Sequence, residues 1–374
     1  WRRDFHQHPE VGFQEYRTAG RVAETLRALG LSVQTEVGKT GVVGVLGSGK
    51  PVIGLRADMD ALPIQEANDD INYASQHPNV MHACGHDAHT AILLGVAQML
   101  SAMPERPAGE LRFFFQPCEE TEDDEGHSGA ELMVEAGALD GVDHVIALHV
   151  GSDLPAGKVV INDGSITAAV DTFYATITGT GCHGAYPQRG VDPIYILAQV
   201  INAIHGIRAR RIDPVRPALI SVGSVHGGDT DNVIPNEVQL TGTMRSYDDA
   251  TRDQLAVELH QAFGVARALG GDYQLRIQRG CPSVFNDAQV AATIRAVARD
   301  LLGPDGLLDS PPGMGGEDFS FMTRKAPGAM FLLGAQYDEI SRPHHSPIFN
   351  IDESSFAVGA AVLAETALRL LKDR

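Results

Sequence analysis

Short apolar segments alternate with helical patterns over residues 1–163, and this alternation constrains the fold more than any other feature of the sequence. Two of the segments, Val52–Ala57 (VIGLRA) and Leu111–Gln116 (LRFFFQ), are almost continuously apolar. Such runs are typical of strands that are buried on both faces, as in parallel sheets covered by helices. The sequence therefore predicts an α/β fold with a mainly parallel sheet. The other expected strands and helices here are Gly41–Leu46, His144–Val150, Thr18–Leu29 and His89–Leu100.

The pattern changes between about Val170 and Cys281. There, strands and helices follow one another in the order β-α-β-β-α-β, which is typical of a ferredoxin-like α+β unit. A helix at Asp287–Leu302, a strand at Ala329–Gly334 and a helix at Ser354–Leu371 then restore the α/β character. We therefore predict a discontinuous large domain, residues 1–165 and 282–374, with a smaller domain, residues 166–281, inserted into it.

Charge and cysteine content exclude several classes of protein. The chain carries 48 acidic and 29 basic side chains, which gives a net charge of −19, whereas nucleic-acid binding requires a basic face. No apolar stretch approaches the ~20 residues that a membrane span requires. The cysteines are widely spaced and form no CxxC pair, which favours a reducing compartment, and we expect the cytoplasm. They are Cys84, Cys118, Cys182 and Cys281.

The segment His82–His89 (HACGHDAH) concentrates three histidines, a thiol and a carboxylate directly before a helical pattern. Cys84 and His86 flank a glycine, so a tight turn can direct both side chains at one metal ion. The alternative interpretation is a helix cap, in which these polar groups only bond to the first turn. The polar groups that follow the predicted strands favour the metal site.

Acidic and histidine side chains follow the ends of three predicted strands, and they are Asp58, Asp60, Glu119, Glu120 and His149. In open α/β sheets, ligands and catalytic groups gather beyond the carboxyl ends of the strands. Because Glu119 and Glu120 are adjacent, they point in different directions, so one can bind metal while the other takes a proton from a metal-activated water. Asp58 suits a carboxylate that orients a ligand imidazole.

Two histidines, His344 and His345, lie in a loop beyond the expected strand Ala329–Gly334. A ligand from this end of the chain would complete a site that is built from several loops. Periodicity does not choose between the two histidines, and both are candidates on the sequence alone.

At these positions the sequence resembles the M20 family of metallopeptidases and amidohydrolases, in the branch of hippurate hydrolases, N-acyl-amino-acid deacylases and auxin-conjugate hydrolases. The motifs occur in the family order and extend nearly from end to end, so the resemblance is specific. They are Arg3–Glu10, Arg56–Pro63, Met81–Asp87, Gln116–Glu120, Asn232–Pro235, Gly316–Ser320 and His345–Pro347. The resemblance implies a metal-binding catalytic domain, with the inserted domain acting as a lid and dimerisation domain.

The resemblance also implies a site for two divalent ions, either Mn²⁺ or Zn²⁺. Its ligands would be Cys84, His86, Glu120, His149 and His345. The resemblance further implies that Glu119 is the general base and that Asp58 is a carboxylate that orients a metal ligand. Two departures from the family pattern affect the expected pocket, because Cys118 stands where alanine or glycine is usual and Cys182 stands where glycine is usual. The acidic stretch Glu119–Gly129 is also longer than expected and would form an extra loop near the pocket mouth.

In the small domain, Gly181–Ala185 resembles the GGHGA loop of the family. The resemblance implies that its histidine, His183, reaches into the active site of a partner subunit and stabilises the oxyanion. Asn232 and Arg245 match positions that hold the carboxylate and neighbouring oxygens of the substrate. Without the resemblance, Arg245 would be expected to pair with Asp248 or Asp249.

The resulting expectation is an enzyme that hydrolyses the amide bond of N-acyl or N-aminoacyl amino acids with a free carboxylate. A metal-activated water would attack the carbonyl, with Glu119 as its base. A homodimer or higher homo-oligomer is expected, with no nucleic-acid or membrane partner. The alternatives are a dipeptidase or carboxypeptidase of the same family, and a catalytically silent binder of amino-acid conjugates.

Overall fold

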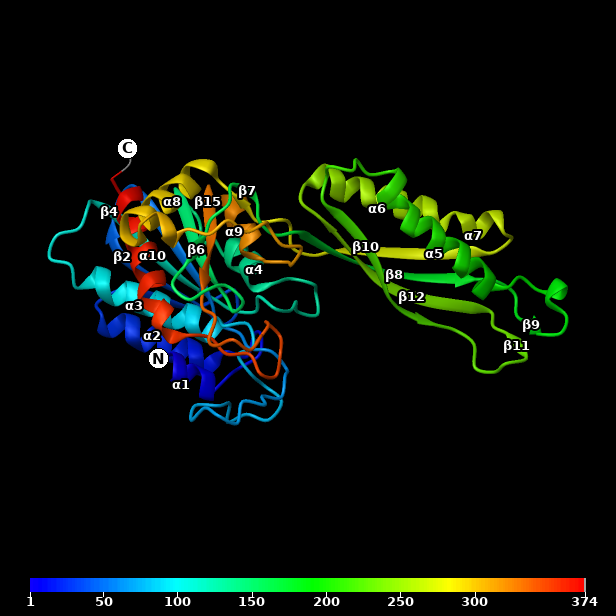
Figure 1. Ribbon diagram of the computed structural model, residues 1–374, viewed down its shortest axis with the longest axis horizontal. Coiled ribbons are helices and arrows are strands. Elements are labelled where there is room, and N and C mark those ends of the chain that lie inside the picture. Colours follow the sequence, from blue (N-terminus) through cyan, green and yellow to red (C-terminus); the bar gives the residue numbers. More distant parts are fainter. Residues whose placement is uncertain (373–374) are drawn as a thin grey trace. The chain divides into compact units, whose positions relative to one another are not determined.

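The computed structural model describes residues 1–372 and divides the chain into two compact units (Figure 1). The first unit comprises Trp1–Gly164, Val284–Pro312 and the chain from Asp318 onward, and the second comprises Ser165–Ser283 and Gly313–Glu317. The sequence predicts that Gly313–Glu317 belongs to the large domain, and here the structure differs. Backbone and tyrosine hydrogen bonds tie this segment to the second unit, because Ala168 N donates to Gly315 O and Tyr247 Oη donates to Gly313 O, each over 2.9 Å.

A seven-stranded sheet forms the centre of the first unit, in the order β1-β2-β4-β3-β5-β15-β6. The four strands β4, β3, β5 and β15 are parallel to their neighbours among themselves, whereas β1, β2 and β6 pair antiparallel at the two edges. The bounds are Ser32–Val37 (β1), Gly41–Ser48 (β2), Val52–Asp58 (β3), Gly109–Gln116 (β4), His144–Gly151 (β5), Val159–Val160 (β6) and Gly328–Gly334 (β15). The predicted mainly parallel arrangement is confirmed for the middle of the sheet.

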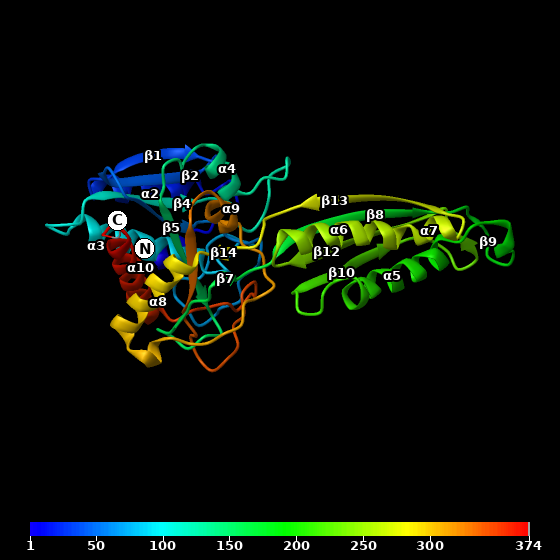
Figure 2. The same ribbon diagram turned by 90° about the horizontal axis from the view of Figure 1, so that it is seen from above.

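Burial on both faces explains the apolar runs in the central strands. All seven residues of β3 are buried, and the three consecutive phenylalanines of β4, Phe113–Phe115, are fully buried as well. Helices α3 and α10 pack against each other and against β3 and β5, and α8 packs against α10 and β15. Helix α4 packs against α9, and Figure 2 shows these helices from a second direction.

The helices of the first unit include several that the sequence does not predict, namely α1, α4 and α9. The α-helical bounds are Arg2–Gln7 (α1), Tyr16–Ala28 (α2), His86–Ser101 (α3), Gly129–Glu135 (α4), Ala288–Leu302 (α8), Phe319–Lys325 (α9) and Phe356–Leu370 (α10). Short elements are β7 (Gly164–Ser165), β14 (Phe285–Asn286), η2 (Pro304–Gly306) and η3 (Glu353–Ser355). Within the described residues, no helix combines the length and apolar character needed to cross a membrane.

Helix α3 begins three residues earlier than its apolar pattern predicts. The preceding residue, Gly85, has a φ of +89°, a left-handed conformation that favours glycine. A Cβ atom at this position would lie 2.4 Å from a methyl carbon of Val150. The turn at Gly85 therefore allows His86 and Asp87 to lie in the first helical turn, where both are buried.

The second unit has the element order β8-α5-β10-β12-α6-β13 and a four-stranded antiparallel sheet in the order β10-β12-β8-β13. Its bounds are Ala169–Thr178 (β8), Cys182–His183 (β9), Pro187–Arg189 (η1), Pro193–Arg210 (α5), Ala218–His226 (β10), Val233–Ile234 (β11), Glu237–Ser246 (β12), Asp249–Phe263 (α6), Val265–Ala268 (α7) and Asp272–Arg279 (β13). The predicted helix Thr251–Ala268 is divided at Gly264 into α6 and α7.

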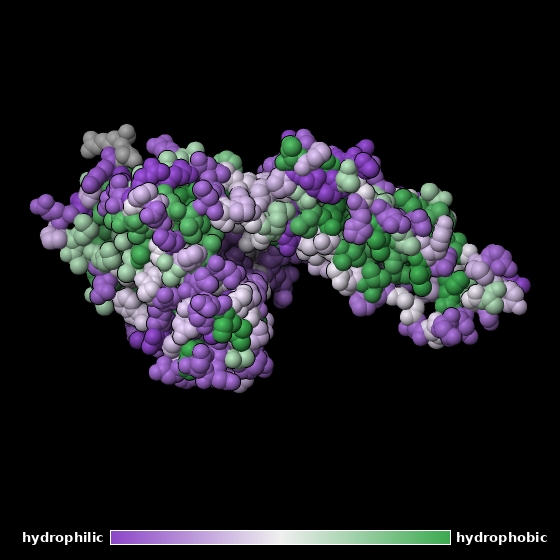
Figure 3. Space-filling view, viewed as in Figure 1, coloured by the Kyte–Doolittle hydropathy of each residue, from purple (hydrophilic) through white to green (hydrophobic). Residues whose placement is uncertain are grey.

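Alternating burial along β8 and β12 shows that only one face of this sheet is covered. The covered face packs against α5 and α6 in a separate core that includes Phe173, Ile177 and Phe263. Some apolar side chains remain exposed on α5, among them Ile194 and Tyr195. Figure 3 shows hydrophobic residues gathered on the visible surface of the second unit.

Candidate metal centre

The predicted metal ligands all belong to the first unit. Cys84 and His86 lie at the start of α3, Glu120 follows β4, His149 is in β5, and His345 is in the loop after β15. Strands β3, β4, β5 and β15 run parallel, so their carboxyl ends meet at one edge of the sheet. The structure therefore brings together the polar groups that the sequence places after separate strands.

The imidazole of His86 is fully buried. One of its ring nitrogens is hydrogen-bonded, and the other has no hydrogen-bond partner among the described residues. Its Nδ1 lies 2.9 Å from the backbone oxygen of Asp60 and 3.1 Å from Asp60 Oδ1, so Nδ1 carries the hydrogen and donates it. Its Nε2 forms no hydrogen bond among the described residues. The carboxylate oxygens around Nε2 are Asp58 Oδ2 at 3.7 Å, Glu119 Oε2 at 3.9 Å and Glu120 Oε1 at 3.9 Å.

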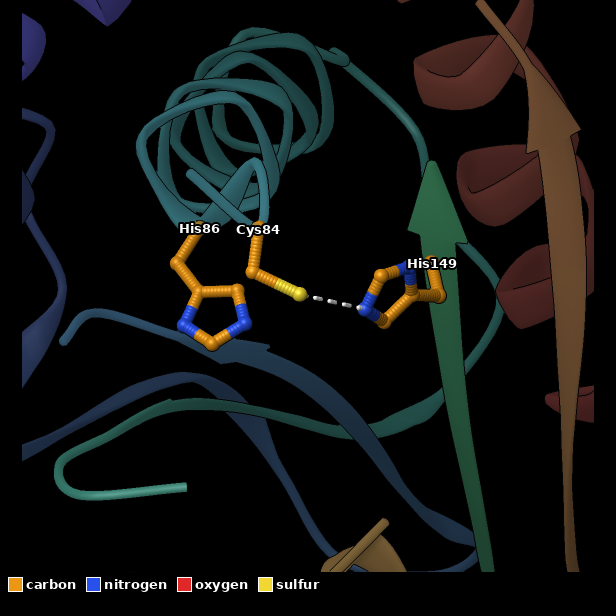
Figure 4. Close-up of side chains that lie close together, drawn as sticks. All are labelled: Cys84, His86 and His149. Carbon is orange, nitrogen blue, oxygen red and sulfur yellow. Dashed lines mark hydrogen bonds between the residues drawn. The ribbon is translucent and has the colours of Figure 1, made fainter. Parts of the chain in front are cut away.

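Cys84 and His149 meet on the other side of the same cluster (Figure 4). The Sγ atom of Cys84 lies 3.6 Å from His149 Nε2. The opposite nitrogen, Nδ1 of His149, bonds the carbonyl oxygen of Val150 over 2.8 Å and therefore carries the hydrogen. In the neutral ring this leaves the Nε2 lone pair directed at the thiol and available to a metal ion.

His345 reaches the cluster through a strained backbone. Its φ of +62° lies in the left-handed region, and its backbone N donates to Ala83 O over 2.8 Å. This conformation directs Nε2 of His345 to within 3.1 Å of Glu120 Oε1. The ring is half-exposed, whereas Glu120 is largely covered.

The electrostatics of the cluster favour a bound cation. Burial lowers the pKa of His86, but Asp58 and the hydrogen bond to Asp60 outweigh it and hold this pKa well above its usual range. Burial raises the pKa of the Cys84 thiol, and the charge of Glu120 raises it further. The negative field that favours a proton on His86 also favours a metal cation beside it. Buried imidazole nitrogens, carboxylates and a thiol together fit a divalent transition-metal ion.

His344 is also part of the cluster, and its contacts separate it from His345. Its Nε2 accepts a hydrogen bond from Ser152 N over 3.5 Å, so the neutral ring carries its hydrogen on Nδ1. That Nδ1 lies 3.6 Å from Cys84 Sγ. Burial, followed by the neighbouring His149, lowers the pKa of His344 to about 2. The geometry therefore makes His344 a hydrogen-bond donor to the sulfur, whereas Nε2 of His345 faces Glu120.

Asp58 makes contacts other than those that the sequence predicts for it. Its Oδ1 lies 2.6 Å from His89 Nδ1, and its Oδ2 accepts a hydrogen bond from Arg56 over 2.7 Å. His89 in turn accepts the backbone N–H of Val150 at its Nε2 over 2.9 Å. Asp58 therefore orients the ring of His89. The other nitrogen of that ring bonds Val150, the strand residue next to His149, so both ring nitrogens of His89 are hydrogen-bonded.

Asp60 has the contacts expected of the carboxylate behind a ligand. Besides bonding His86, it accepts the backbone N–H of Glu120 at Oδ2 over 3.0 Å. The sequence predicts Asp58 for this role, which stays a prediction: Asp58 Oδ2 lies 3.7 Å from His86 Nε2, whereas the hydrogen bonds to His86 come from Asp60. Both follow the same strand, and because β3 ends at Asp58, only the path of the chain beyond the strand decides which carboxylate reaches His86.

His183 and Asn232 lie in neighbouring loops of the second unit. Strand β9 pairs with β11 so that His183 is opposite Val233, and Gly184 N donates to Asn232 O over 2.7 Å. The Nδ1 of His183 accepts the backbone N–H of Ala185 over 3.0 Å, so the neutral ring carries its hydrogen on Nε2. Both side chains are exposed.

Arg245 is half-buried in β12, and it forms no ion pair in the part of the chain that the structure describes. Its guanidinium donates to Thr243 Oγ1 and to the backbone oxygen of Met244. Burial lowers the pKa of Arg245, an effect that the charges of Cys281 and Asp171 oppose. Asp248, one of the expected surface partners, pairs instead with Arg216 over 3.2 Å.

The acidic stretch after Glu120 forms a hydrogen-bonded loop that leads into α4. Asp123 Oδ1 accepts the backbone N–H groups of Glu125 and His127, and its Oδ2 lies 2.6 Å from Lys39 Nζ. Cys118 is fully buried, with its Sγ 3.2 Å from the backbone oxygen of Thr121. This thiol therefore lies inside the protein beneath the loop.

Comparison with known proteins identifies the family. The model of peptidase family M20/M25/M40 matches residues 54–369. An N-acyl-L-amino acid amidohydrolase of Geobacillus stearothermophilus is 42% identical over 81% of this chain and 83% of its own length. Thermostable carboxypeptidase 1 of Saccharolobus solfataricus is 39% identical over 98% of this chain and 94% of its own.

A solved structure extends the similarity to the fold. The crystal structure of a Bacillus subtilis protein, described as a dinuclear metal binding peptidase from the M20 family, superposes with a TM-score of 0.86. It is 32% identical, and the match covers 99% of this chain and 96% of the other. These findings confirm the resemblance inferred from the motifs. The chain belongs to peptidase family M20/M25/M40, a family of metal-dependent hydrolases.

Proposed function

We propose that this protein hydrolyses the amide bond of N-acyl or N-aminoacyl amino acids that carry a free carboxylate. One observation carries the proposal: the buried Nε2 of His86, which has no hydrogen-bond partner among the described residues, faces carboxylate oxygens of Asp58, Glu119 and Glu120 at 3.7–3.9 Å. A buried imidazole nitrogen surrounded by acidic oxygens suits a cation better than any other ligand.

Cys84, His86, Glu120, His149 and His345 would hold two divalent ions, Mn²⁺ or Zn²⁺. When bound, such ions lower the pKa of a water and polarise a carbonyl oxygen. Glu119 is adjacent to the proposed ligand Glu120, and its Oε2 lies 3.9 Å from His86 Nε2, which supports a role beside the bound ions. We assign Glu119 as the base that accepts the proton of the attacking water and delivers it to the leaving nitrogen.

The second unit would supply oxyanion stabilisation and substrate recognition. The tautomer of His183 supports this, because the Ala185 N–H occupies Nδ1 and leaves an N–H donor at Nε2. A donor on an exposed loop can serve the active site of a second copy, and we propose a homodimer, or a higher homo-oligomer, in which the lid domains pair. Arg245 and Asn232 would bind the substrate carboxylate, and Arg245 has no acidic partner in the described part of the chain, which leaves its guanidinium available.

A substrate screen tests the proposal. Protein loaded with Mn²⁺ or Zn²⁺ would be assayed against N-acetyl and N-benzoyl amino acids, dipeptides, and longer peptides with a free carboxyl end. Preferred turnover of N-acyl amino acids supports the proposal. Preferred turnover of peptides favours a dipeptidase or carboxypeptidase, as the name of the 39% identical relative would suggest. Tight binding of conjugates without turnover would indicate a silent binder and overturn the proposal.

A further inference from the structure

We propose that Glu15 is a positioning residue that fixes the turn carrying Glu119 and Glu120, and this inference rests on the proposed function. Glu15 immediately precedes α2 and is fully buried. Its Oε1 accepts the backbone N–H of Cys118 over 2.8 Å, and its Oε2 accepts the hydroxyl of Thr40 over 2.5 Å. A carboxylate from the N-terminal part of the chain therefore holds the residue that precedes Glu119.

The turn that Glu15 holds is unfavourable by itself. Cys118 has a φ of +44°, a left-handed conformation that costs a residue with a side chain roughly 1 kcal/mol or more. Its carbonyl oxygen accepts the N–H of Gly129 over 2.9 Å, so both backbone polar groups of Cys118 are fixed. With these bonds in place, the chain leaves β4 in the direction that brings Glu119 and Glu120 to the cluster.

The same turn is held on the other side of Glu119. Asp60 Oδ2 accepts the backbone N–H of Glu120 over 3.0 Å. The N–H groups before and after Glu119 thus each bond a buried carboxylate, Glu15 on one side and Asp60 on the other. Since a displacement of about 1 Å can lower catalysis by about 10²-fold, such a frame suits the backbone of a general base.

The environment of Glu15 argues against a purely stabilising role. Glu15 forms no ion pair among the described residues, and its partners are a neutral amide and a neutral hydroxyl. A buried carboxylate without a cation is costly for folding, so a well-packed apolar side chain would stabilise this position better. Burial, followed by the charge of Asp60, raises the pKa of Glu15 to about 7.

Glu10 offers a matched control. Its carboxylate also bonds backbone N–H groups near the start of α2, those of Arg17 at 3.0 Å and Thr18 at 2.8 Å. Among the described residues, its carboxylate bonds these two amides and not the turn at Cys118. Loss of Glu10 should therefore weaken the same helix without moving Glu119.

The test compares Glu15→Ala, Glu15→Gln and Glu10→Ala in the metal-loaded full chain. Glutamine can accept the Cys118 N–H at its oxygen and donate its amide hydrogen to the Thr40 hydroxyl, so it can keep both contacts. We expect Glu15→Ala to lower kcat by about 10- to 100-fold with KM within about two-fold, and Glu15→Gln to restore kcat. Glu10→Ala should leave kcat unchanged. A stabilising role alone predicts the same kcat for all folded variants.

Hydrogen exchange gives a readout that does not depend on activity. In metal-free protein, the amide of Cys118 should exchange faster in Glu15→Ala than in wild type or Glu15→Gln. Faster exchange with wild-type kcat would overturn the proposal, and so would unchanged exchange. If Glu15→Ala does not fold, Glu15→Asp withdraws the carboxylate by one methylene group and is judged by the same two measurements.

The proposal and the proposed function can fail separately. If wild type cleaves no amide substrate, the proposed function is wrong. The positioning role of Glu15 is then tested by hydrogen exchange at Cys118 together with metal affinity in the same variants. In that case we expect Glu15→Ala, but not Glu15→Gln, to weaken metal binding through the displaced Glu120. Equal metal affinities in wild type, Glu15→Ala and Glu15→Gln would then overturn the positioning role.

Discussion

His345 and Glu120 come from separate chain segments of the first unit, and His345 Nε2 lies only 3.1 Å from Glu120 Oε1. The hydrogen bond to Glu120 raises the pKa of His345, and His345 contributes to lowering the pKa of Glu120, although burial of Glu120 opposes this. The two side chains therefore attract each other when His345 is protonated. We expect a bound metal ion to take the place of that proton between them.

The first prediction concerns metal content. We expect two divalent ions per chain, because the donor set of a thiol, three imidazoles and a carboxylate exceeds what one tetrahedral ion needs. Elemental analysis of protein from metal-replete growth should give a ratio near two, and a chelator should abolish activity. The absence of bound metal combined with chelator-resistant activity would refute the mechanism.

The second prediction separates the two adjacent glutamates. Glu119→Gln should keep metal and fold but lower kcat by at least ~10²-fold, which is typical for loss of a general base. Glu120→Gln should weaken metal binding, because it removes the carboxylate that contacts His345. Elemental analysis and steady-state kinetics of both variants distinguish the roles, and reversed phenotypes would reverse the assignment.

Much of the fold follows from local pattern. Buried strands such as β3 and β4 are recognisable because a strand covered on both faces is almost continuously apolar. Strand β1 is missed because its residues are mostly exposed and lack an apolar run. Helices α4 and α9 have seven residues each, too few for the 3.6-residue period to be distinctive.

The site is predictable in its composition but not in its contacts. The residue types and their positions after strands indicate a metal centre. Which of Asp58 and Asp60 hydrogen-bonds His86 depends on the chain path after β3. The different contacts of His344 and His345 depend on the left-handed φ of His345 and on the hydrogen bond from the Ser152 amide to His344. Glu15 gives no sequence signal, because its partner Cys118 is distant in the chain and is bonded through its backbone.

The third prediction concerns pH and stability. Burial raises the pKa of Glu15 to about 7, above the value of 4.5 that is usual for a glutamate, so the folded state binds its proton more tightly than the unfolded state. The stabilisation is therefore complete below pH 4.5 and is lost as the pH rises through about 7. Compared with Glu15→Gln, metal-free wild type should lose up to about 3 kcal/mol of unfolding free energy across this range.

Denaturant unfolding at several pH values measures this difference. The groups that face Glu15 are the Thr40 hydroxyl, the Cys118 amide and the carboxylate of Asp60, and all are retained in the variant. Parallel stability profiles for wild type and Glu15→Gln would show that Glu15 does not titrate in this range.

The fourth prediction concerns the assembly. If His183 acts in the active site of a second copy, each active site contains Glu119 from one chain and His183 from the other. Glu119→Gln and His183→Ala then remove residues that different chains supply. Mixing the two inactive proteins should partly restore activity, because each mixed dimer contains one site with both residues intact. Subunit exchange would be verified with differently tagged chains, and exchange without recovery would contradict sharing of His183.

The last prediction concerns recognition of the substrate carboxylate. A chain with a net charge of −19 repels anions at long range, so local groups must overcome that field. Arg245 offers a planar fork that can bind a carboxylate through two hydrogen bonds, and it has no competing acidic partner among the described residues. Arg245→Ala should therefore lower kcat/KM by roughly 10²-fold, and amidation of the substrate carboxylate should cause a similar loss in wild type.

The two losses should not add, because each removes the same contact. Kinetics of wild type and Arg245→Ala with free-acid and amidated substrates complete a double-mutant cycle. Arg216 provides the control, since it already pairs with Asp248 over 3.2 Å and its substitution by alanine should leave kcat/KM unchanged. Additive losses would mean that Arg245 and the carboxylate act independently. Equal cleavage of free-acid and amidated substrates would remove the requirement for a carboxylate and favour a broader amidase.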